Sequence, residues 1–445
     1  MISITEYKDK QVFLEHLAAF DIAENPYQSY AFYSVYFKNN ASGNYLFYEM
    51  HENGELIAII PIECNGYNKL TGVRKMRFIG YRKFNYQQYI CKNENVKRVH
   101  DAFIEHIKRL KVVFDYYDIS DATPLFNVLS ESDLVKAKIQ LYCCPWIRIN
   151  NDFETFFKET FTSSKKRTEL KKFQKRLAEL GDLKLINIYD EQSYSQNTKY
   201  LEQIYRVHKE RFANVYATSF FGSESKRAYY SELIETLMKY KKGYISLVVL
   251  DDVTIAFIFC LANTKMLIDW IPAFDPAFSK YNLGTVQYKM LLEELCNNSS
   301  IEVFDYSKGS SVYKSRWAKE NTYNYQFIVN TCPGNLFCDL EAWYEKSIFK
   351  FKTYLREKGV LSWIKHKMGS VRAMMHQKKE ETVNVRVEHL QVDDSRKAVE
   401  FHYKDIRDYP VSVREEVLSS IYKGESVCGY SILDGNTTIQ MAECK

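Results

Sequence analysis

The sequence contains little proline and glycine, and it has no long uninterrupted run of apolar residues. Only 8 of its 445 residues are proline and 16 are glycine, which excludes collagen-like and linker-dominated chains. No apolar run approaches the roughly 20 residues that a transmembrane helix needs. Because the first residues show no signal-peptide pattern, we expect a cytoplasmic protein. An apolar fraction of 46% and an aromatic fraction of 15% provide enough material for buried cores and argue against disorder.

The usual signatures of metal, nucleotide and nucleophilic sites are also missing. None of the ten cysteines stands in a CxxC pair, and their spacing is not that of zinc ligands. We therefore expect no metal and reduced thiols. The sequence contains no P-loop and no GxGxxG motif. No Ser-His-Asp or Cys-His arrangement can be argued from spacing, which disfavours a covalent enzyme intermediate.

The formal net charge is only +5, but the basic residues gather in two segments, 165–176 and 346–379. Such clusters can meet phosphates, nucleic acid or an anionic membrane, and a solvated helix face is an equally good interpretation. Segment 340–375 mixes Trp343, Phe351 and Trp363 with lysines and arginines, which predicts basic amphipathic helices. Peripheral contact with the inner face of a membrane is one use for them. Segment 165–176 shows no aromatic residues at stacking spacing, which argues against nucleic acid as a partner.

One succession of elements occurs twice. In the second half, β-branched and apolar runs predict a hairpin at 244–250 and 253–261, a third strand at 266–270, a helix over 284–296 and a short strand at 301–305. In the first half, the same order of hairpin, strand, helix and strand is predicted at 44–50, 55–62, 74–79, 96–110 and 112–118. The pattern predicts a duplicated α/β unit. Further helices are expected over 193–212 and 223–240.

The predicted fold is therefore α/β (α+β), with two tandem units whose mixed central sheets are flanked by helices. A helical segment and a small α/β tail, with a hairpin at 427–439, complete it. We divide the chain into a first unit at 1–150, a second unit at 151–330, basic amphipathic helices at 331–380 and an appendage at 381–445.

The most specific motif is Phe304-Asp-Tyr-Ser-Lys-Gly-Ser-Ser-Val-Tyr-Lys-Ser-Arg-Trp317. It resembles the signature of the CelD/BioF-like acetyltransferases, a branch of the GNAT superfamily that is related in fold to the FemABX aminoacyl transferases. The hairpin 52–61 and the junction formed by 144–149 and 163–170 also resemble that family. The resemblance covers about residues 1–330. It departs where the family often carries Ser-Pro-Gly and this chain carries Asn282-Leu283-Gly284.

The resemblance implies roles for individual residues. Asp305 is a general base or, equally well, a hydrogen-bond acceptor for the turn at 308–309. Tyr313 donates to a leaving thiolate or orients the acceptor, and His208 faces the cleft from its helix. The phosphates of the donor would meet a helix amino terminus and nearby ammonium groups, provided by Tyr281, Asn282, Leu283, Gly284, Lys308 and Lys314. The acceptor would meet Arg211, Trp270 and Arg316.

The implied function is direct transfer of an acetyl or similar acyl group from acetyl-CoA or another acyl-CoA. The acceptor would be an amine or hydroxyl of a sugar, such as a nucleotide-sugar or a lipid-linked precursor of surface polysaccharide. One alternative is a FemABX-type, tRNA-dependent aminoacyl transferase that acts on a peptidoglycan precursor. Another is a non-catalytic GNAT scaffold that docks on a membrane or a glycan-assembly complex.

Overall fold

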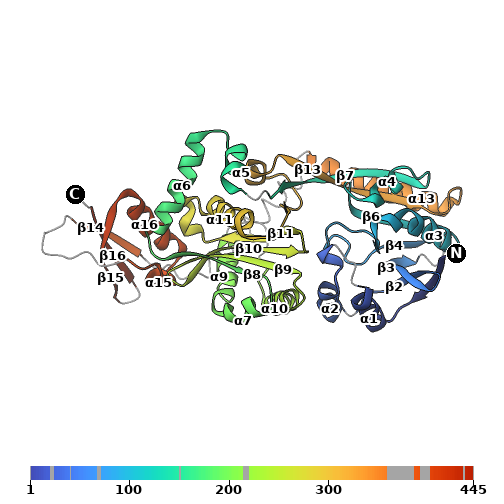
Figure 1. Ribbon diagram of the computed structural model, residues 1–445, viewed down its shortest axis with the longest axis horizontal. Coiled ribbons are helices and arrows are strands. Elements are labelled where there is room, and N and C mark those ends of the chain that lie inside the picture. Colours follow the sequence, from blue (N-terminus) through green and yellow to red (C-terminus); the bar gives the residue numbers. More distant parts are fainter. Residues whose placement is uncertain are drawn as a thin grey trace.

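The computed structural model describes residues 2–20, 25–40, 42–67, 72–149, 152–213, 220–357, 385–390, 401–433 and 436–443. The molecule is elongated, with the first unit at one end, the second unit in the middle and the C-terminal appendage at the other end (Figure 1). Much of the predicted basic segment, residues 358–384, lies outside the described residues. Within the described part of the chain, every helix is too short or too polar to serve as a membrane span.

The two units share one continuous sheet. Its strands follow one another in the order β1 (Ile2–Tyr7), β2 (Tyr45–Glu52), β3 (Glu55–Tyr67), β4 (Arg74–Phe78), β6 (Val112–Ser120), β13 (Glu320–Asn330), β7 (Val135–Arg148), β12 (Val303–Asp305), β11 (Met266–Phe274), β10 (Val253–Ala262), β9 (Gly243–Leu250) and β8 (Leu183–Ile188). The short strand β5 (Ile90–Cys91) pairs with β3.

This strand order is symmetric about the β13–β7 pair. On each side lie an edge strand, an antiparallel hairpin, a third strand and a fourth strand parallel to the third. The helix between the third and fourth strands is α3 (Val96–Lys108) in the first unit and α11 (Leu283–Asn298) in the second. The predicted duplication is therefore confirmed as a repeated topology.

The last strand of each unit is exchanged. Strand β7 follows the first unit in sequence but pairs with β12 of the second unit, and β13 follows the second unit but pairs with β6 of the first. The two exchanged strands pair with each other from Glu320↔Trp146 to Val329↔Val135. The sequence pattern predicted neither strand, because pairing between distant segments leaves no local signal.

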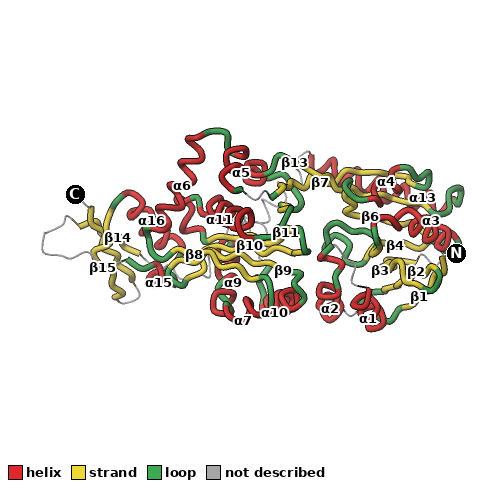
Figure 2. The backbone as a smooth tube through the Cα atoms, in the orientation of Figure 1, coloured by secondary structure: helices red, strands yellow, loops and turns green. Residues whose placement is uncertain are grey.

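Helices cover both faces of the sheet (Figure 2). The remaining helices are α1 (Lys10–Phe20), α2 (Tyr30–Asn39), α4 (Pro124–Ser130), α5 (Phe153–Thr160), α6 (Ser164–Ala178), α7 (Glu191–Gln196), α8 (Thr198–Leu201), α9 (Ile204–Phe212), α10 (Glu224–Lys239), α12 (Val312–Trp317) and α13 (Leu336–Glu357), with short 3₁₀ turns η1 (Pro26–Gln28), η2 (Asn93–Asn95) and η3 (Pro276–Tyr281). The expected single helix over 193–212 is broken into α7, α8 and α9. The reason is local: the Asn197 side chain donates to the Ser193 carbonyl where the first piece ends.

One apolar core joins the two units directly. It packs α1 and α2 of the first unit against α10 and strands β9–β11 of the second, with Phe13, Phe32, Leu237 and Phe257 among its buried members. Lys38 on α2 and Glu232 on α10 form an ion pair across the same junction.

The described part of the C-terminal appendage comprises a three-stranded sheet and two helices. Strands β14 (Val385–Leu390), β16 (Asn436–Glu443) and β15 (Glu425–Leu433) form the sheet, and the β15–β16 pair confirms the predicted hairpin. Helices α15 (Tyr403–Ile406) and α16 (Val411–Lys423) pack against η3, the turn that leads into α11.

A buried ion pair fastens the appendage to the second unit. Arg414 on α16 and Asp275 at the start of η3 are both fully buried and in direct contact. Asp275 also accepts a hydrogen bond from the Tyr403 hydroxyl, and Arg206 of α9 lies 3.2 Å from the same carboxylate oxygen.

We expect Arg414→Met to lower the free energy of unfolding by about 3–5 kcal/mol, because it leaves the Asp275 carboxylate buried beside a weaker set of partners. Urea denaturation of the full chain measures the effect. Arg407→Met is the matched control, since Arg407 pairs with Asp408 at the surface. Equal stability of the two variants would contradict a structural role for the buried pair.

Candidate functional site

Strands β11 and β12 form a fork. They run parallel and pair only from Met266↔Val303 to Ile268↔Asp305, after which they diverge. A register shift between Phe259 and Cys260 in the neighbouring strand β10 accompanies the divergence. In parallel sheets, ligands collect at the carboxyl ends of strands that part.

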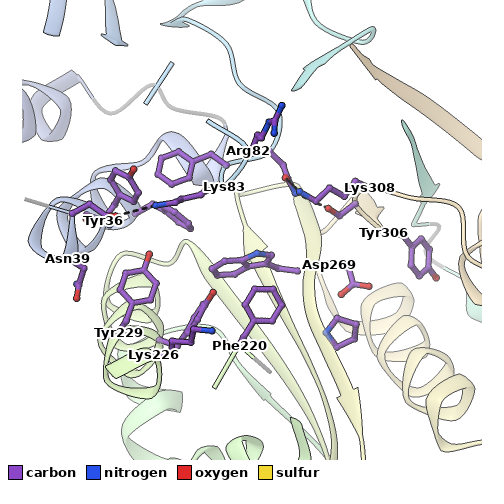
Figure 3. A pocket seen from close by; sticks show the side chains of 18 of the residues that line it. Tyr36, Asn39, Arg82, Lys83, Phe220, Lys226, Tyr229, Asp269, Tyr306 and Lys308 are labelled. Atoms are coloured by element: carbon purple, nitrogen blue, oxygen red, sulfur yellow. Dashed lines mark hydrogen bonds between the residues drawn. The ribbon is translucent and has the colours of Figure 1, made fainter. Parts of the chain in front are cut away.

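A cavity of about 940 Å³ lies at this fork, between the two units. The first unit contributes α2 and the loop 82–85, and the second contributes residues 220–230, β11 and the loop 306–314. Figure 3 shows Arg82 and Lys83 of the first unit on one side of the cavity, with Lys226, Asp269 and Tyr306 of the second unit around the rest of it.

Asp269 is the carboxylate in the cavity wall. It is only 3% exposed, and its Oδ2 accepts a hydrogen bond from the Tyr288 hydroxyl at 2.6 Å. Its Oδ1 is buried and has no hydrogen-bond partner among the described residues. Burial raises the pKa of Asp269 to about 7, against the lowering effects of the Tyr288 hydrogen bond and the Lys314 charge. A cavity-lining carboxylate with a near-neutral pKa and one oxygen without a hydrogen-bond partner among the described residues is suited to general base catalysis.

Aromatic side chains surround Asp269. The ring of Tyr288 stacks on that of Tyr313 with centroids 5.5 Å apart, and Tyr306 packs on Tyr288 at the same separation. Tyr306 and Tyr313 line the cavity. The Tyr306 hydroxyl is buried without a hydrogen-bond partner among the described residues, and burial holds its pKa well above the ordinary value. This hydroxyl therefore stays protonated.

The predicted phosphate ligands Lys308 and Lys314 both line the cavity, but they differ in their engagement. The Lys314 ammonium donates to three backbone carbonyls, those of Tyr306 at 2.6 Å, Ser307 at 3.3 Å and Lys308 at 2.9 Å. Its donors are thus used to hold the loop. Lys308 is exposed and donates to Asn85 Oδ1 of the first unit at 3.0 Å.

Asp305 lies next to the cavity without lining it. Its Oδ1 accepts the Ser307 backbone N–H at 2.6 Å, which is the turn-acceptor interaction considered for it. Burial raises its pKa to about 6, while Tyr86 and the Ser307 N–H act in the opposite direction. Through this hydrogen bond, Asp305 holds the start of the loop that carries Lys308.

The other predicted residues are dispersed. Trp270 lines the cavity. His208 on α9 is buried among Phe212, Phe221 and Phe257, and burial lowers its pKa to about 4. The Arg211 guanidinium lies 4.6 Å from the Phe274 ring centroid, and Arg316 is exposed on α12.

The four residues predicted at the amino terminus of α11 do not line this cavity. The Tyr281 hydroxyl donates to the Leu418 carbonyl of α16 at 2.9 Å, and Leu283 is buried in the core shared with the appendage. Asn282 adopts a left-handed conformation with φ of 52°. A Cβ on Gly284 would lie 2.8 Å from Cε1 of Phe274, so glycine is needed there for packing.

Sequence reasoning missed Asp269, Tyr306 and the cations Arg82, Lys83 and Lys226. For Asp269 a signal existed: an aspartate inside the otherwise apolar strand 266–274. The cations had no such signal, because only the packing of the two units brings them together.

Comparisons with known proteins agree with the fold. Residues 164–315 match the family model described as an acetyltransferase (GNAT) domain. This segment contains β11, α11, β12 and the 304–317 motif up to residue 315, and it confirms the GNAT resemblance for the second unit. No curated protein shows significant similarity to the chain.

Several solved structures share the general arrangement at low identity. FemX is 10% identical with a TM-score of 0.49, covering 73% of this chain and 98% of FemX. The C-terminal domain of a putative lysylphosphatidylglycerol synthetase from Agrobacterium fabrum is 12% identical with a TM-score of 0.47, covering 72% and 92%. L-PGS from Bacillus licheniformis is 11% identical with a TM-score of 0.46, covering 75% and 96%.

The raised pKa of Asp269 predicts a pH-dependent difference between the parent protein and Asp269→Asn. The folded protein binds the Asp269 proton more tightly than the unfolded chain does. The free energy of unfolding of the parent should therefore fall, relative to the variant, as the pH rises from about 4 to about 7, by roughly 1.4 kcal/mol per pKa unit. Urea denaturation across this range tests it, and parallel stability curves would refute it.

Proposed function

We propose that this GNAT-domain chain transfers an acyl group to an amine or hydroxyl acceptor bound between its two units. The observation that supports this most is the buried Asp269 at the fork of β11 and β12, whose Oδ1 has no hydrogen-bond partner among the described residues. The family match to residues 164–315 supports acyl transfer as the chemistry and acetyl-CoA as the first donor to test. We propose a sugar or cell-envelope precursor as the acceptor.

Asp269 would act as the general base. The N–H or O–H of the acceptor donates to Asp269 Oδ1, and the proton moves to that oxygen as the acceptor atom bonds to the acyl carbon. The bond between the acyl carbon and the carrier of the donor then breaks. The carboxylate is already oriented by the Tyr288 hydroxyl, so no rearrangement is needed before proton transfer.

Tyr306 would assist from the other strand of the fork. Its free hydroxyl can donate a hydrogen bond to the oxygen that gains negative charge during acyl transfer. The aromatic rings of Tyr288 and Tyr313 exclude water from this wall, which strengthens such a hydrogen bond. Trp270 and Phe84 supply apolar surface in the same cavity, against which a sugar ring can stack.

The charge of the cavity rim supports an anionic substrate. The cavity is lined by Arg82, Lys83, Lys226 and Lys308. Among the described residues that line it, Asp269 is the only carboxylate. A substrate that carries phosphate groups, whether donor or acceptor, has the complementary charge.

We also propose peripheral contact with an anionic membrane through α13. Its inner face packs on the sheet through Cys338 and Ala342. Its outer face exposes a stripe of large apolar side chains flanked by Lys346 and Lys350. The stripe consists of Leu336, Leu340, Trp343, Phe351 and Tyr354, each more than half exposed. Aromatic and lysine side chains on one exposed face suit the boundary of an anionic bilayer.

Transfer activity should depend on Asp269 more than on Asp305. With labelled acetyl-CoA and a panel of amino sugars and nucleotide-linked amino sugars, we expect Asp269→Asn to lower kcat by about 10²–10⁴-fold with a smaller change in KM. Asp305→Asn is the matched control, a neighbouring buried carboxylate outside the cavity lining. A larger loss of kcat in Asp305→Asn would place the base at Asp305, and a parent that acetylates no member of the panel would argue against the proposed substrates.

Membrane contact should depend on the exposed aromatic residues of α13. We expect Trp343→Ser to reduce co-sedimentation of the full chain with vesicles rich in phosphatidylglycerol, because Trp343 is 64% exposed on the stripe. Tyr189→Ser removes an aromatic residue that is 53% exposed elsewhere and should leave sedimentation unchanged. Equal sedimentation with neutral vesicles, or no effect of Trp343→Ser, would contradict the proposal.

A further inference from the structure

The amino terminus of α11 is where the GNAT resemblance would place the phosphates of an acyl-CoA. Free backbone N–H groups and the helix dipole make such an end suitable for anions. In this chain the end is approached by the C-terminal appendage from one side and by Phe274 from another. These contacts decide whether a phosphate group can be held there.

Helix α16 covers the outer side of this end. The Tyr281 hydroxyl donates to the Leu418 carbonyl, and the Lys280 ammonium donates to Ser419 Oγ. Tyr281 and Leu283 are buried in one core with Val417 and Leu418. The nearest cation on the turn is therefore already bound by the appendage, and the apolar residues beside it have no open surface.

The covering helix is firmly attached. The buried pair of Arg414 and Asp275 lies at the start of η3, six residues before Tyr281. Arg414 also contacts Glu210 of α9 at 2.8 Å. Arg414 therefore links α16 directly to the start of η3 and to α9 through two carboxylates.

The inner side of the same end is filled by packing. The Phe274 ring lies against Gly284, and the Arg211 guanidinium lies over the Phe274 ring. Because Gly284 has no side chain, the Phe274 ring can pack directly against its backbone. The residues present at 281–284 do not fit the pyrophosphate of CoA.

At the rim of the inter-unit cavity, in contrast to the α11 end, cationic side chains are exposed. Arg82, Lys83, Lys226 and Lys308 are exposed, and none of them forms a salt bridge within the described part of the chain. Lys83 and Lys308 donate to the neutral amide oxygens of Asn40 and Asn85, which hold the ammonium groups without cancelling their charge. Four cations from two units thus line one cavity (Figure 3), and the Arg82 guanidinium lies 5.0 Å and 5.6 Å from the ring centroids of Tyr81 and Tyr117.

We infer that α15–α16 closes the amino terminus of α11 to the donor and that the phosphates of the donor bind instead at the cavity rim formed by Arg82, Lys83, Lys226 and Lys308. The inference rests on the proposed function, since it concerns the donor for the same cavity. The appendage is then a determinant of donor specificity, because it removes the backbone anion site and leaves side-chain cations from both units to hold the phosphates.

Calorimetric titration of the full chain with CoA, and separately with inorganic pyrophosphate, tests this. We expect Lys83→Ala combined with Lys226→Ala to weaken CoA binding about tenfold or more, because two charge-assisted contacts are lost. Lys280→Ala is the matched control at the α11 end and should bind CoA as the parent does. Both variants change exposed or half-buried lysines, and their unfolding curves verify that they are folded.

The inference would be overturned by normal CoA binding of the rim variant, with or without weaker binding by Lys280→Ala, or by a parent that binds neither CoA nor pyrophosphate. Asp269→Asn separates this result from the chemistry. It keeps the rim and should bind CoA with the affinity of the parent while losing turnover. If the rim variant binds normally but Asp269→Asn still loses turnover, the rim assignment fails and the proposed function stands.

Discussion

The exchange of strands β7 and β13 is the constraint on which the rest of the structure depends. Each strand completes the sheet of the unit that did not precede it, and the two pair with each other along most of their length. The backbone hydrogen bonds of that central pair hold the units in one orientation. Asn85 reinforces it by donating to Ser307 Oγ and accepting from Lys308 across the junction. The cavity exists because this orientation places loop 82–85 opposite the fork of β11 and β12.

A fixed orientation also explains how the chain tolerates a carboxylate in its interior. Burial opposes ionisation of Asp269, and the Tyr288 hydroxyl offsets only part of that cost. Water enters unfolded chains freely, so the penalty belongs to the folded state alone. Such a cost is retained where a near-neutral pKa is useful. The Tyr306 hydroxyl, directly after β12, is likewise buried without a hydrogen-bond partner among the described residues, and Asp269 and Tyr306 both line the cavity.

Local patterns in the sequence were sufficient to predict the hairpins, the third and fourth strands, α3 and α11, because hydrophobic periodicity reports on elements one at a time. They also led to the 304–317 motif, whose Lys308, Tyr313 and Lys314 line the cavity. They could not predict β13, which pairs with a partner about 200 residues away, nor distinguish Asp269 from Asp305. Both are aspartates in strand segments, and only the divergence of β11 and β12 after Ile268↔Asp305 opens the first to the cavity.

Two parts of β11 therefore differ in how tightly they are packed, in a fold that otherwise follows the GNAT arrangement. In its middle, at Asp269, β11 has parted from β12, and Asp269 Oδ1 has no hydrogen-bond partner among the described residues. At its far end, Phe274 fills the space at Gly284 and the appendage buries Tyr281 and Leu283. The amino terminus of a helix binds anions through backbone N–H groups and needs no side chains for it. Where that end is covered, side-chain cations elsewhere have to bind the phosphates. Among the described residues, the rim of the inter-unit cavity has such cations without carboxylates at ion-pair distance. Under the proposed function, the apposition of the two units would serve both to hold an anionic donor and to enclose the acceptor.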